Sequence, residues 1–353
     1  MTAPSAPSAP EASAAPAHQA PAARHVLLVG ATGTIGTAVR AALIARGHRV
    51  TCLLRPGRAA PPEWQGMARD MAQPAPAEVI HADVTDPASL ARDAFAGRHY
   101  DALVSCMASR SGTAKDAWAI DHAAHRTLLA AAEAAGLRHM VLLSAICVQK
   151  PVLAFQQAKL AFEAELQRAA LTWSIVRPTA FFKSLSGQIA RVQAGKPFLM
   201  FGDGRLTACK PISDRDLAAY IADCLTDPAR HNRVLPIGGP GPAITPRDQL
   251  RMLAGLMGRP VRSRQVPVAM MDAIIAGLSA LGRVSPRMRA RAEFARIGRY
   301  YATESMLVLD PATGRYDADA TPETGTDRLR DHYADVLAGR ARVDLGDHAA
   351  FGP

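Results

Sequence analysis

The fold of this chain is decided by the stretch His25-Val26-Leu27-Leu28-Val29-Gly30-Ala31-Thr32-Gly33-Thr34-Ile35-Gly36. An apolar run leads into three glycines spaced three apart and then into a helical pattern, which predicts a strand, a tight turn and a helix. Gly30 permits the turn, Gly33 lets backbone amides approach a pyrophosphate, and Gly36 lets the helix pack close to the strand. Because the N-terminus of a helix favours an anion, this segment predicts a dinucleotide-binding site.

Strand and helix patterns alternate after this segment, and such an alternation is typical of a parallel doubly wound sheet. Further strands are expected at residues 50–54, 78–81, 102–106, 140–145 and 173–176, with helices at residues 89–95, 117–135 and 154–170. Gly136 is expected to end the second of these helices. The fold class is therefore α/β, with a Rossmann-type doubly wound parallel sheet.

From about residue 202 the alternation becomes less regular, which indicates a second, smaller part of the chain. A helix is expected at residues 211–225, a short strand at 234–237, and a further helix that Thr245 caps and Pro246 begins. Four parts are thus predicted: an Ala/Pro-rich disordered tail (residues 1–23), a Rossmann domain (24–201), an α/β substrate lobe (202–340) and a C-terminal tail (341–353).

Composition argues against several classes of protein. The 353 residues are 49% hydrophobic, but they hold no apolar run long enough to cross a bilayer and no secretory signal, so a soluble, cytoplasmic protein is expected. The five cysteines include no Cys-x-x-Cys pair, so no metal site is expected, and Cys52, Cys106 and Cys147 are placed in strands as reduced thiols. The net charge of +10 comes with only 5% aromatic residues, which argues against nucleic-acid binding.

Charged residues after the second strand indicate which dinucleotide is bound. Where an NAD-binding fold usually has an acid, this chain has Arg55-Pro56-Gly57-Arg58, and its guanidinium groups favour the 2′-phosphate of NADPH. Asp83 is expected either to accept a hydrogen bond from the adenine or to cap a helix, and Ser105 is expected at the nicotinamide. The predicted cofactor-binding residues are Gly30, Thr32, Gly33, Thr34, Ile35, Gly36, Arg55, Arg58, Asp83, Ser105, Lys159 and Pro178.

The catalytic residues of short-chain dehydrogenases are only partly present. Such enzymes have a serine after the fifth strand and a Tyr-x-x-x-Lys pair on the next helix; here Ser144 and Lys159 occur, but Phe155 stands at the tyrosine position. Loss of the phenol removes the acid for carbonyl reduction and favours hydride addition to a conjugated carbon–carbon double bond. Lys159 is predicted to hold the nicotinamide ribose and to place positive charge near a developing anion, or else to pair with Glu163 on the helix surface.

Several longer strings of residues carry a resemblance to a known family. They are residues 155–160 (FQQAKL), 175–185 (IVRPTAFFKSL), 201–204 (FGDG), 208–213 (ACKPIS), 235–241 (LPIGGPG) and 299–306 (RYYATESM). Through them the chain, over roughly residues 24–333, resembles the NmrA-like branch of the atypical short-chain dehydrogenases, and within it the NADPH-dependent 8-vinyl reductases of divinyl chlorophyllide. The resemblance implies reduction of the 8-vinyl group of a divinyl chlorophyllide or protochlorophyllide to ethyl, in chlorophyll or bacteriochlorophyll synthesis.

The substrate that this resemblance implies is a large, flat, apolar ring with a carboxylate, which needs a wide apolar pocket with a cation at its rim. Ser144 and Lys159 are the predicted catalytic residues, and the proton donor is left open among Lys159, Tyr300, Tyr301 and water. Core packing is the alternative for Phe181 and Phe182. The predicted substrate set is Phe155, Phe181, Phe182, Lys183, Tyr300 and Tyr301.

An apolar segment at residues 266–281 lies between Arg262, Arg264, Arg283 and Arg287. Such basic flanks predict peripheral membrane contact or a lid over an apolar ligand, and a buried or partner-facing helix is the alternative. Two other functions fit parts of the sequence. One is a carbonyl-reducing short-chain dehydrogenase, which Phe155 disfavours; the other is a non-catalytic NADP-binding redox sensor of the NmrA-like type, which would not need Ser144 or Lys159.

Overall fold

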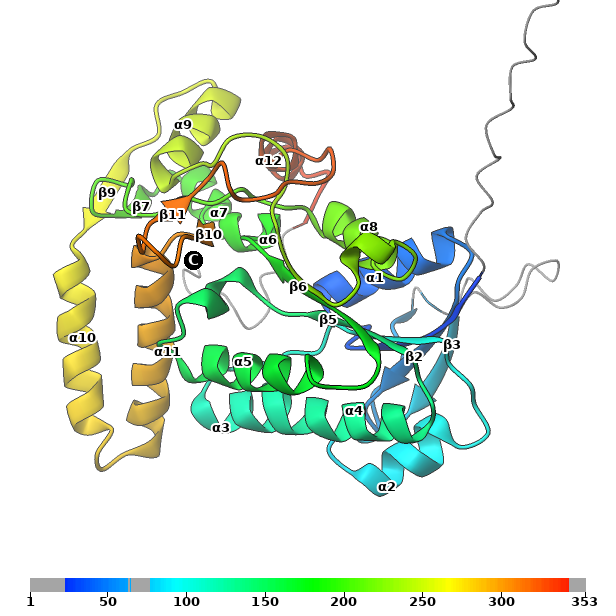
Figure 1. The fold of residues 1–353 in the computed structure, drawn as a ribbon. Helices are drawn as coiled ribbons and strands as arrows, with labels where there is room; N and C mark the ends of the chain where they lie inside the picture. Colours follow the sequence, from blue (N-terminus) through cyan, green and yellow to red (C-terminus); the bar gives the residue numbers. More distant parts are fainter. Residues whose placement is uncertain (1–22, 63, 65–76, 343–353) are drawn as a thin grey trace, which may run out of the picture.

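A seven-stranded parallel sheet forms the centre of the molecule (Figure 1). The computed structural model describes residues 23–62, 64 and 77–342. The order of the strands reverses between β1 and β4, and in such sheets ligands bind outside the carboxyl ends of the strands at that point. The sheet runs β3 (Ala77–His81), β2 (Arg49–Leu54), β1 (His25–Val29), β4 (Ala102–Ser105), β5 (His139–Leu143), β6 (Thr172–Pro178), β8 (Arg233–Ile237), which is the predicted fold class.

Helices cover both faces of the sheet, because the side chains of its strands are apolar on both faces, as β1 illustrates. Val26 and Leu28 pack on the face covered by α1 (Thr34–Ala45) and α8 (Asp214–Asp223). Leu27 and Val29 pack on the opposite face, which is covered by the π-helical segment Leu90–Phe95, α4 (His125–Ala134) and α5 (Ala154–Leu166). Because successive side chains of a strand point to opposite faces, a strand buried on both sides reads as an unbroken apolar run.

A second, smaller core is built from elements that follow β6. It lies among α6 (Phe182–Leu185), α7 (Ile189–Gln193), β7 (Phe198–Phe201), α9 (Pro246–Met257) and α12 (Leu329–Leu337). β7 pairs in parallel with β9 (Ser263–Val266), and β10 (Val308–Leu309) pairs with β11 (Tyr316–Asp317). The predicted start of α9 is confirmed, because the Thr245 hydroxyl accepts a hydrogen bond from the Asp248 amide and Pro246 is the first helical residue.

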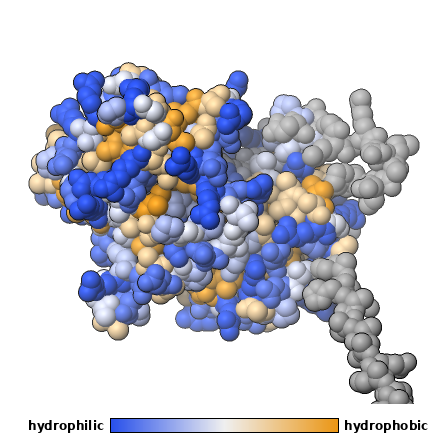
Figure 2. All heavy atoms as spheres, turned by 90° about the horizontal axis from the view of Figure 1, so that it is seen from above, coloured by the Kyte–Doolittle hydropathy of each residue, from blue (hydrophilic) through white to orange (hydrophobic). Residues whose placement is uncertain are grey.

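A helical hairpin, α10 (Val268–Leu281) and α11 (Pro286–Thr303), stands at one edge of the molecule (Figure 1). The inner helix, α11, is tied to the sheet-bearing part because Glu293 Oε2 accepts a hydrogen bond from the Ala114 amide at 3.3 Å. The outer helix, α10, packs on α11. Within the described ranges no helix is both long enough and apolar enough to cross a bilayer. On the face seen from above (Figure 2), hydrophobic residues are interspersed with hydrophilic ones.

The structure differs from the sequence-based expectations in several elements. The predicted boundary between residues 201 and 202 does not mark the end of the sheet, because α8 and β8 return from the predicted lobe to cover and extend it. Cys147 lies in the 3₁₀ turn Ile146–Gln149 rather than in a strand, since β5 ends at Leu143. The helix expected at 117–135 begins at Ala114 and includes the π-helical segment Trp118–Ala124. Residues 1–22 and 343–353 of the predicted tails lie outside the described residues.

Candidate active site

The glycine-rich loop between β1 and α1 has the geometry of an anion site. Gly30 has a φ of +79°, and a Cβ there would lie 2.6 Å from the carbonyl carbon of Cys106. A Cβ on Gly36 would lie 2.1 Å from the carbonyl oxygen of Gly30, so glycine is needed for α1 to start this close to β1. Gly33 is the N-cap of α1 and offers no side-chain cap, which leaves amides of the first turn available to an anion. The residues present therefore fit a dinucleotide pyrophosphate.

Lys183, which is predicted to contact the substrate ring, lies beside the glycine-rich loop. Its Nζ donates a hydrogen bond to Thr34 Oγ1 at 2.9 Å. Thr34 is exposed and Thr32 is partly buried in the same loop, whereas the Ile35 side chain packs into the core beneath it. A lysine at this place adds positive charge next to the amides of α1.

Arg55 and Arg58 are exposed just beyond the end of β2. Asp83, beyond the end of β3, accepts hydrogen bonds through Oδ1 from the Thr85 amide at 2.9 Å and from the Thr85 hydroxyl at 2.7 Å. These bonds, and more weakly the charge of Arg55, hold the pKa of Asp83 below its usual range. The following helix, Pro87–Ser89, is capped by Asp86, so the helix-cap alternative for Asp83 is wrong. Asp83 remains a candidate for the adenine.

Lys159 is held by a buried carboxylate from another helix. Its Nζ lies 2.9 Å from Oδ1 of Asp121, a residue of the π-helical segment Trp118–Ala124 that is 1% exposed. Asp121 also accepts hydrogen bonds from Ser109, at 2.6 Å from its hydroxyl and at 3.2 Å from its amide. The loop that follows β4 is thereby fixed to the same carboxylate that orients the lysine.

The alternative pairing of Lys159 with Glu163 is wrong. Glu163 is 1% exposed and its carboxylate accepts hydrogen bonds from the Arg177 guanidinium of β6, with Nε at 3.2 Å from Oε2. The hydroxyl of Ser144 also donates to Glu163. Residues four apart on a helix share a face only roughly. Here Arg177 of the sheet binds Glu163, and Asp121 of a second helix binds Lys159. Ser144, one of the two predicted catalytic residues, is engaged in this buried network.

Ser105, at the carboxyl end of β4, is buried against a histidine that the sequence analysis did not single out. Its Oγ lies 2.9 Å from Nε2 of His125, and His125 Nδ1 lies 2.9 Å from the Ile120 carbonyl oxygen. A carbonyl can only accept, so Nδ1 carries the proton and Nε2 accepts from Ser105. Burial, assisted by the charge of Lys159, lowers the pKa of His125 to about 4, so its ring is neutral at pH 7.

The predicted aromatic residues do not gather in one pocket. Phe155 and Tyr300 are buried in a shared cluster, where the Tyr300 hydroxyl donates to the Cys147 carbonyl at 2.9 Å. Tyr301 is 45% exposed as a residue, and its hydroxyl lies 3.7 Å from Cys147 Sγ. Phe182 is buried in the second, smaller core, and Phe181 packs against the core of the main sheet, which favours the packing alternative for both. Pro178, a predicted cofactor-binding residue, is the buried last residue of β6.

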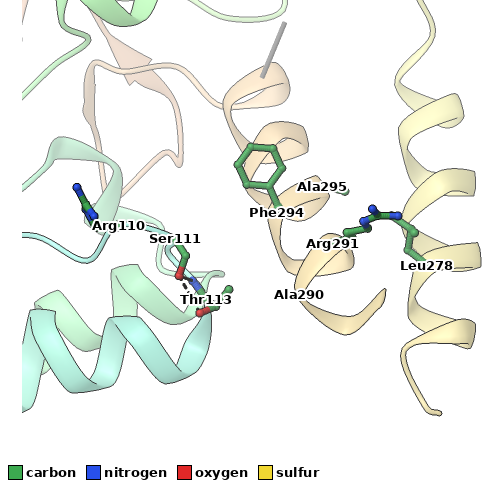
Figure 3. Close-up of a pocket in the computed structure, with 8 residues that line it drawn as sticks. All are labelled: Arg110, Ser111, Thr113, Leu278, Ala290, Arg291, Phe294 and Ala295. Atoms are coloured by element: carbon green, nitrogen blue, oxygen red, sulfur yellow. Dashed lines mark hydrogen bonds between the residues drawn. The ribbon is translucent and has the colours of Figure 1, made fainter. Parts of the chain in front are cut away.

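A cleft of about 620 Å³ opens between the loop after β4 and the helical hairpin (Figure 3). Its volume lies within the range that small-molecule sites occupy. Gly112 of the same loop lies between α11 and α5, the helix that carries Lys159. A Cβ at Gly112 would lie 2.9 Å from the Ile297 side chain of α11 and 3.8 Å from the Phe155 side chain of α5. The lining residues are Arg110, Ser111 and Thr113 of the loop, Leu278 of α10, and Ala290, Arg291, Phe294 and Ala295 of α11.

Comparison with known proteins identifies the family to which this chain belongs. A profile described as NAD(P)H-binding matches residues 30–228. The divinyl chlorophyllide a 8-vinyl-reductase of Oryza sativa subsp. indica is 49% identical over 343 residues, which cover 94% of this chain and 83% of that protein. The chain belongs to the divinyl chlorophyllide a 8-vinyl-reductase family.

A second member of the family and a solved structure with a similar fold also match this chain. The divinyl chlorophyllide a 8-vinyl-reductase of Zea mays is 49% identical over 337 residues, covering 92% of this chain and 82% of that protein. The NADPH-dependent quinone oxidoreductase QOR2 of Escherichia coli, solved with NADPH, superposes with a TM-score of 0.63 at 18% identity and covers 88% of this chain and 99% of its own. This structural likeness concerns the fold alone.

Several residues at the candidate site of this 8-vinyl-reductase family member could not be identified from the sequence alone. Asp121, Ser109 and His125 lie on a helix and a loop whose pattern looked ordinary, and only the folded chain brings them to Lys159 and Ser105. An aspartate and a histidine four residues apart were a weak signal for them. Arg291 and Phe294 were missed because an arginine-rich helix resembles a solvated surface helix.

Proposed function

We propose that this protein uses NADPH to reduce the 8-vinyl group of a divinyl chlorophyllide or protochlorophyllide to an ethyl group, in chlorophyll or bacteriochlorophyll synthesis. The observation that carries the proposal is 49% identity over 94% of the chain to a protein named for that reaction. Phe155 at the position where carbonyl-reducing relatives have a tyrosine supports it, because no alkoxide needs a proton when an alkene is reduced.

The cofactor would be held along the carboxyl edge of β1, β2 and β4. Gly33, Thr34 and Lys183 would bind its pyrophosphate, and Ser105 and Lys159 would lie at the end that holds the nicotinamide. NADPH supplies the hydride when it is bound there. This placement is supported by the uncapped N-terminus of α1 and by the buried partners that fix Ser105 and Lys159.

Arg55 and Arg58 would set the choice of NADPH over NADH by binding the 2′-phosphate. Charge-assisted hydrogen bonds are worth about 1.5–3 kcal/mol each, so the double variant Arg55→Ala/Arg58→Ala should raise the Kd for NADPH roughly 100-fold or more. The Kd for NADH, which lacks that phosphate, should stay unchanged. Fluorescence titration of both coenzymes measures this, and Arg126→Ala, an exposed arginine of α4, is the control. Equal losses for both coenzymes would contradict the assignment.

Lys159 is our candidate for the residue that manages charge and the proton. Hydride addition to the vinyl group leaves negative charge spread into the ring, and a proton must then reach the neighbouring carbon. The ammonium of Lys159 can stabilise that charge and carry the proton, with Asp121 holding its orientation. Tyr300 suits the task less well, because its hydroxyl donates to the Cys147 carbonyl and burial raises its pKa.

The cleft between the loop after β4 and α11 is our candidate for the macrocycle. Phe294 and Leu278 give it apolar walls, and Arg110 and Arg291 supply cations of the sign that a propionate requires. Figure 3 shows Phe294 on α11, with Arg291 reaching from the same helix toward Leu278. The loop that forms the opposite wall is the one that Ser109 fixes to Asp121, so the cleft and the lysine share a support.

The deciding experiment mixes the purified protein with divinyl chlorophyllide or divinyl protochlorophyllide and either NADPH or NADH, and follows pigment absorption and product mass. We expect a gain of two hydrogens with NADPH and a loss of turnover of about 100-fold or more in Lys159→Ala. Consumption of a keto compound with the vinyl group untouched would favour a carbonyl reductase. Tight NADPH binding without turnover of either substrate would favour a redox sensor.

A further inference from the structure

The outer helix of the hairpin presents a row of large apolar side chains to solvent. Met270, Ile274 and Leu281 of α10 are 49%, 49% and 56% exposed, and Val284 in the turn after it is 87% exposed. At 100° per residue, the three side chains of α10 fall within a narrow sector of the helix. We call these four residues the apolar stripe.

The packing of α10 does not account for this stripe. The helix contacts α11 along its inner side, yet none of its fourteen residues is buried. Asp272 is the one charged residue of α10, and it pairs with Arg299 of α11. The stripe is therefore free of charge over the whole length of the helix, an arrangement that is costly in water because large apolar side chains stay hydrated.

Exposed arginines stand at both ends of the stripe. Arg262 and Arg264 precede α10, and Arg283 and Arg287 follow it. From Val268 to Thr303 the hairpin carries six arginines and two acids, Asp272 and Glu293. Asp272 is paired with Arg299, and Glu293 accepts a hydrogen bond from the Ala114 amide, whereas Arg283 and Arg287 are exposed.

We propose that the α10–α11 hairpin docks this protein on the surface of an anionic bilayer, with the apolar stripe inserted among the acyl chains and the arginines at the phosphate level. Helix α10 has fourteen residues, which is too short to span a bilayer, so it lies in the plane of the interface. The arginines at both ends give electrostatic attraction to anionic headgroups, which a second copy of the same positively charged hairpin would not provide. The inference goes beyond the proposed function and does not depend on it.

This docking would also set the direction in which the candidate cleft opens. Leu278 of α10 and Phe294 of α11 line the cleft, and both belong to the hairpin. An apolar ligand dissolved in the bilayer could then enter beside the docked helix without crossing water.

The test is flotation of the full-length protein with vesicles of phosphatidylcholine alone or with about one third phosphatidylglycerol, at low and high salt. We expect binding to the anionic vesicles that weakens with salt. Arg283→Gln/Arg287→Gln should lower the partition coefficient roughly 30-fold, since each interfacial arginine contributes about a fivefold gain. Met270→Gln/Ile274→Gln/Leu281→Gln should lower it more than 100-fold, because the apolar contribution is lost.

Matched controls replace exposed residues elsewhere. Val152→Gln/Leu206→Gln removes two side chains that are 64% and 47% exposed, and Arg126→Gln/Arg330→Gln removes two exposed arginines. Both should float like the wild type, and all variants should keep the wild-type NADPH affinity and melting temperature. The proposal is overturned if the wild type ignores anionic vesicles or if the stripe variant floats unchanged. A dimer that the stripe variant abolishes, with no vesicle binding, would show that a second copy covers the hairpin. None of these readouts uses vinyl reduction.

Discussion

Lys159 differs from the surface lysines of this chain in what surrounds its ammonium. Lys150 pairs with Glu304 while its own side chain is 45% exposed, whereas Lys159 is 12% exposed and meets a carboxylate that is fully buried. An exposed ion pair is screened by water and contributes little to stability. A buried carboxylate fixes the position of its partner, because losing the partner would leave an unpaired charge away from water. We therefore regard Asp121 as a positioning residue for Lys159.

A double-mutant cycle tests this relation. Asp121→Asn should lower kcat roughly 10-fold because the lysine loses its orientation, and Lys159→Ala should lower it roughly 100-fold. The double variant should be no slower than Lys159→Ala alone, since Asp121 acts through the lysine. If the two losses multiply, Asp121 has a separate role. Vinyl-reduction kinetics with saturating NADPH provide the measurement.

Gly36 is a second single position on which the site depends. Gly36→Ala should raise the Kd for NADPH at least 10-fold and lower the free energy of unfolding by about 1–3 kcal/mol, because its Cβ would overlap the Gly30 carbonyl oxygen at 2.1 Å. Gly255→Ala on α9 is the matched control: a Cβ there meets no atom within 4 Å, so stability should rise by about 0.5–1 kcal/mol. NADPH titration and thermal unfolding distinguish the two. An unchanged Kd in Gly36→Ala would refute the phosphate site.

At the scale of elements, one helix supplies the cap that another lacks. Thr113 is the N-cap of α3 (Ala114–Ala117) but makes no side-chain cap, and the Ala114 amide donates instead to Glu293 of α11. A carboxylate at a helix N-terminus satisfies a free amide and meets the positive end of the helix dipole. This contact joins the hairpin to the loop that lines the cleft.

Removing that cap should loosen the cleft locally. Glu293→Ala should cost about 1 kcal/mol and raise amide hydrogen exchange at residues 109–117, because the loop and the start of α3 lose their anchor. Thr245→Ala removes the cap of α9 and should cost a similar amount, about 1 kcal/mol, without changing exchange at 109–117. Equal exchange at that segment in both variants would mean that Glu293 does not hold the loop.

At the scale of the whole molecule, buried histidines make stability depend on pH. Burial lowers the pKa of His125 to about 4 and that of His139 to about 3, the latter with help from His231 and Arg24. In the unfolded chain both rings take up protons near their ordinary pKa of 6.5. The unfolded state therefore binds more protons as pH falls below about 6.5, and acid favours unfolding in that window.

We expect the free energy of unfolding to be constant between about pH 7 and 8 and to fall between about pH 6.5 and 4, by up to about 3 kcal/mol for His125. His125→Gln and His139→Gln should each flatten this slope, while His99→Gln, at an exposed position, should leave it as in the wild type. Urea unfolding at a series of pH values measures it. A slope that His125→Gln leaves intact would show that the acid sensitivity comes from other groups.

The sequence by itself determined the layered fold and the glycine-rich turn between β1 and α1. Gly30, Gly33 and Gly36 could be recognised because their spacing is a local property of a strand, a turn and a helix. Doubly buried strands are continuous apolar runs, and helix caps such as Thr245-Pro246 are decided within four residues. The pairing of β8 with β6 could not be predicted, because a strand that joins a sheet after a long excursion has no local sequence feature that identifies its partner.

Only the tertiary structure decided which polar groups meet. Glu163 was a plausible partner for Lys159 by helix spacing, but the sheet supplied Arg177 to Glu163 and the π-helical segment supplied Asp121 to Lys159. The contact of Lys183 with Thr34 could not be predicted for the same kind of reason. A side chain's partner depends on the packing of elements far apart in the chain, and buried charges are paired across that packing because desolvation makes an unpaired one too costly.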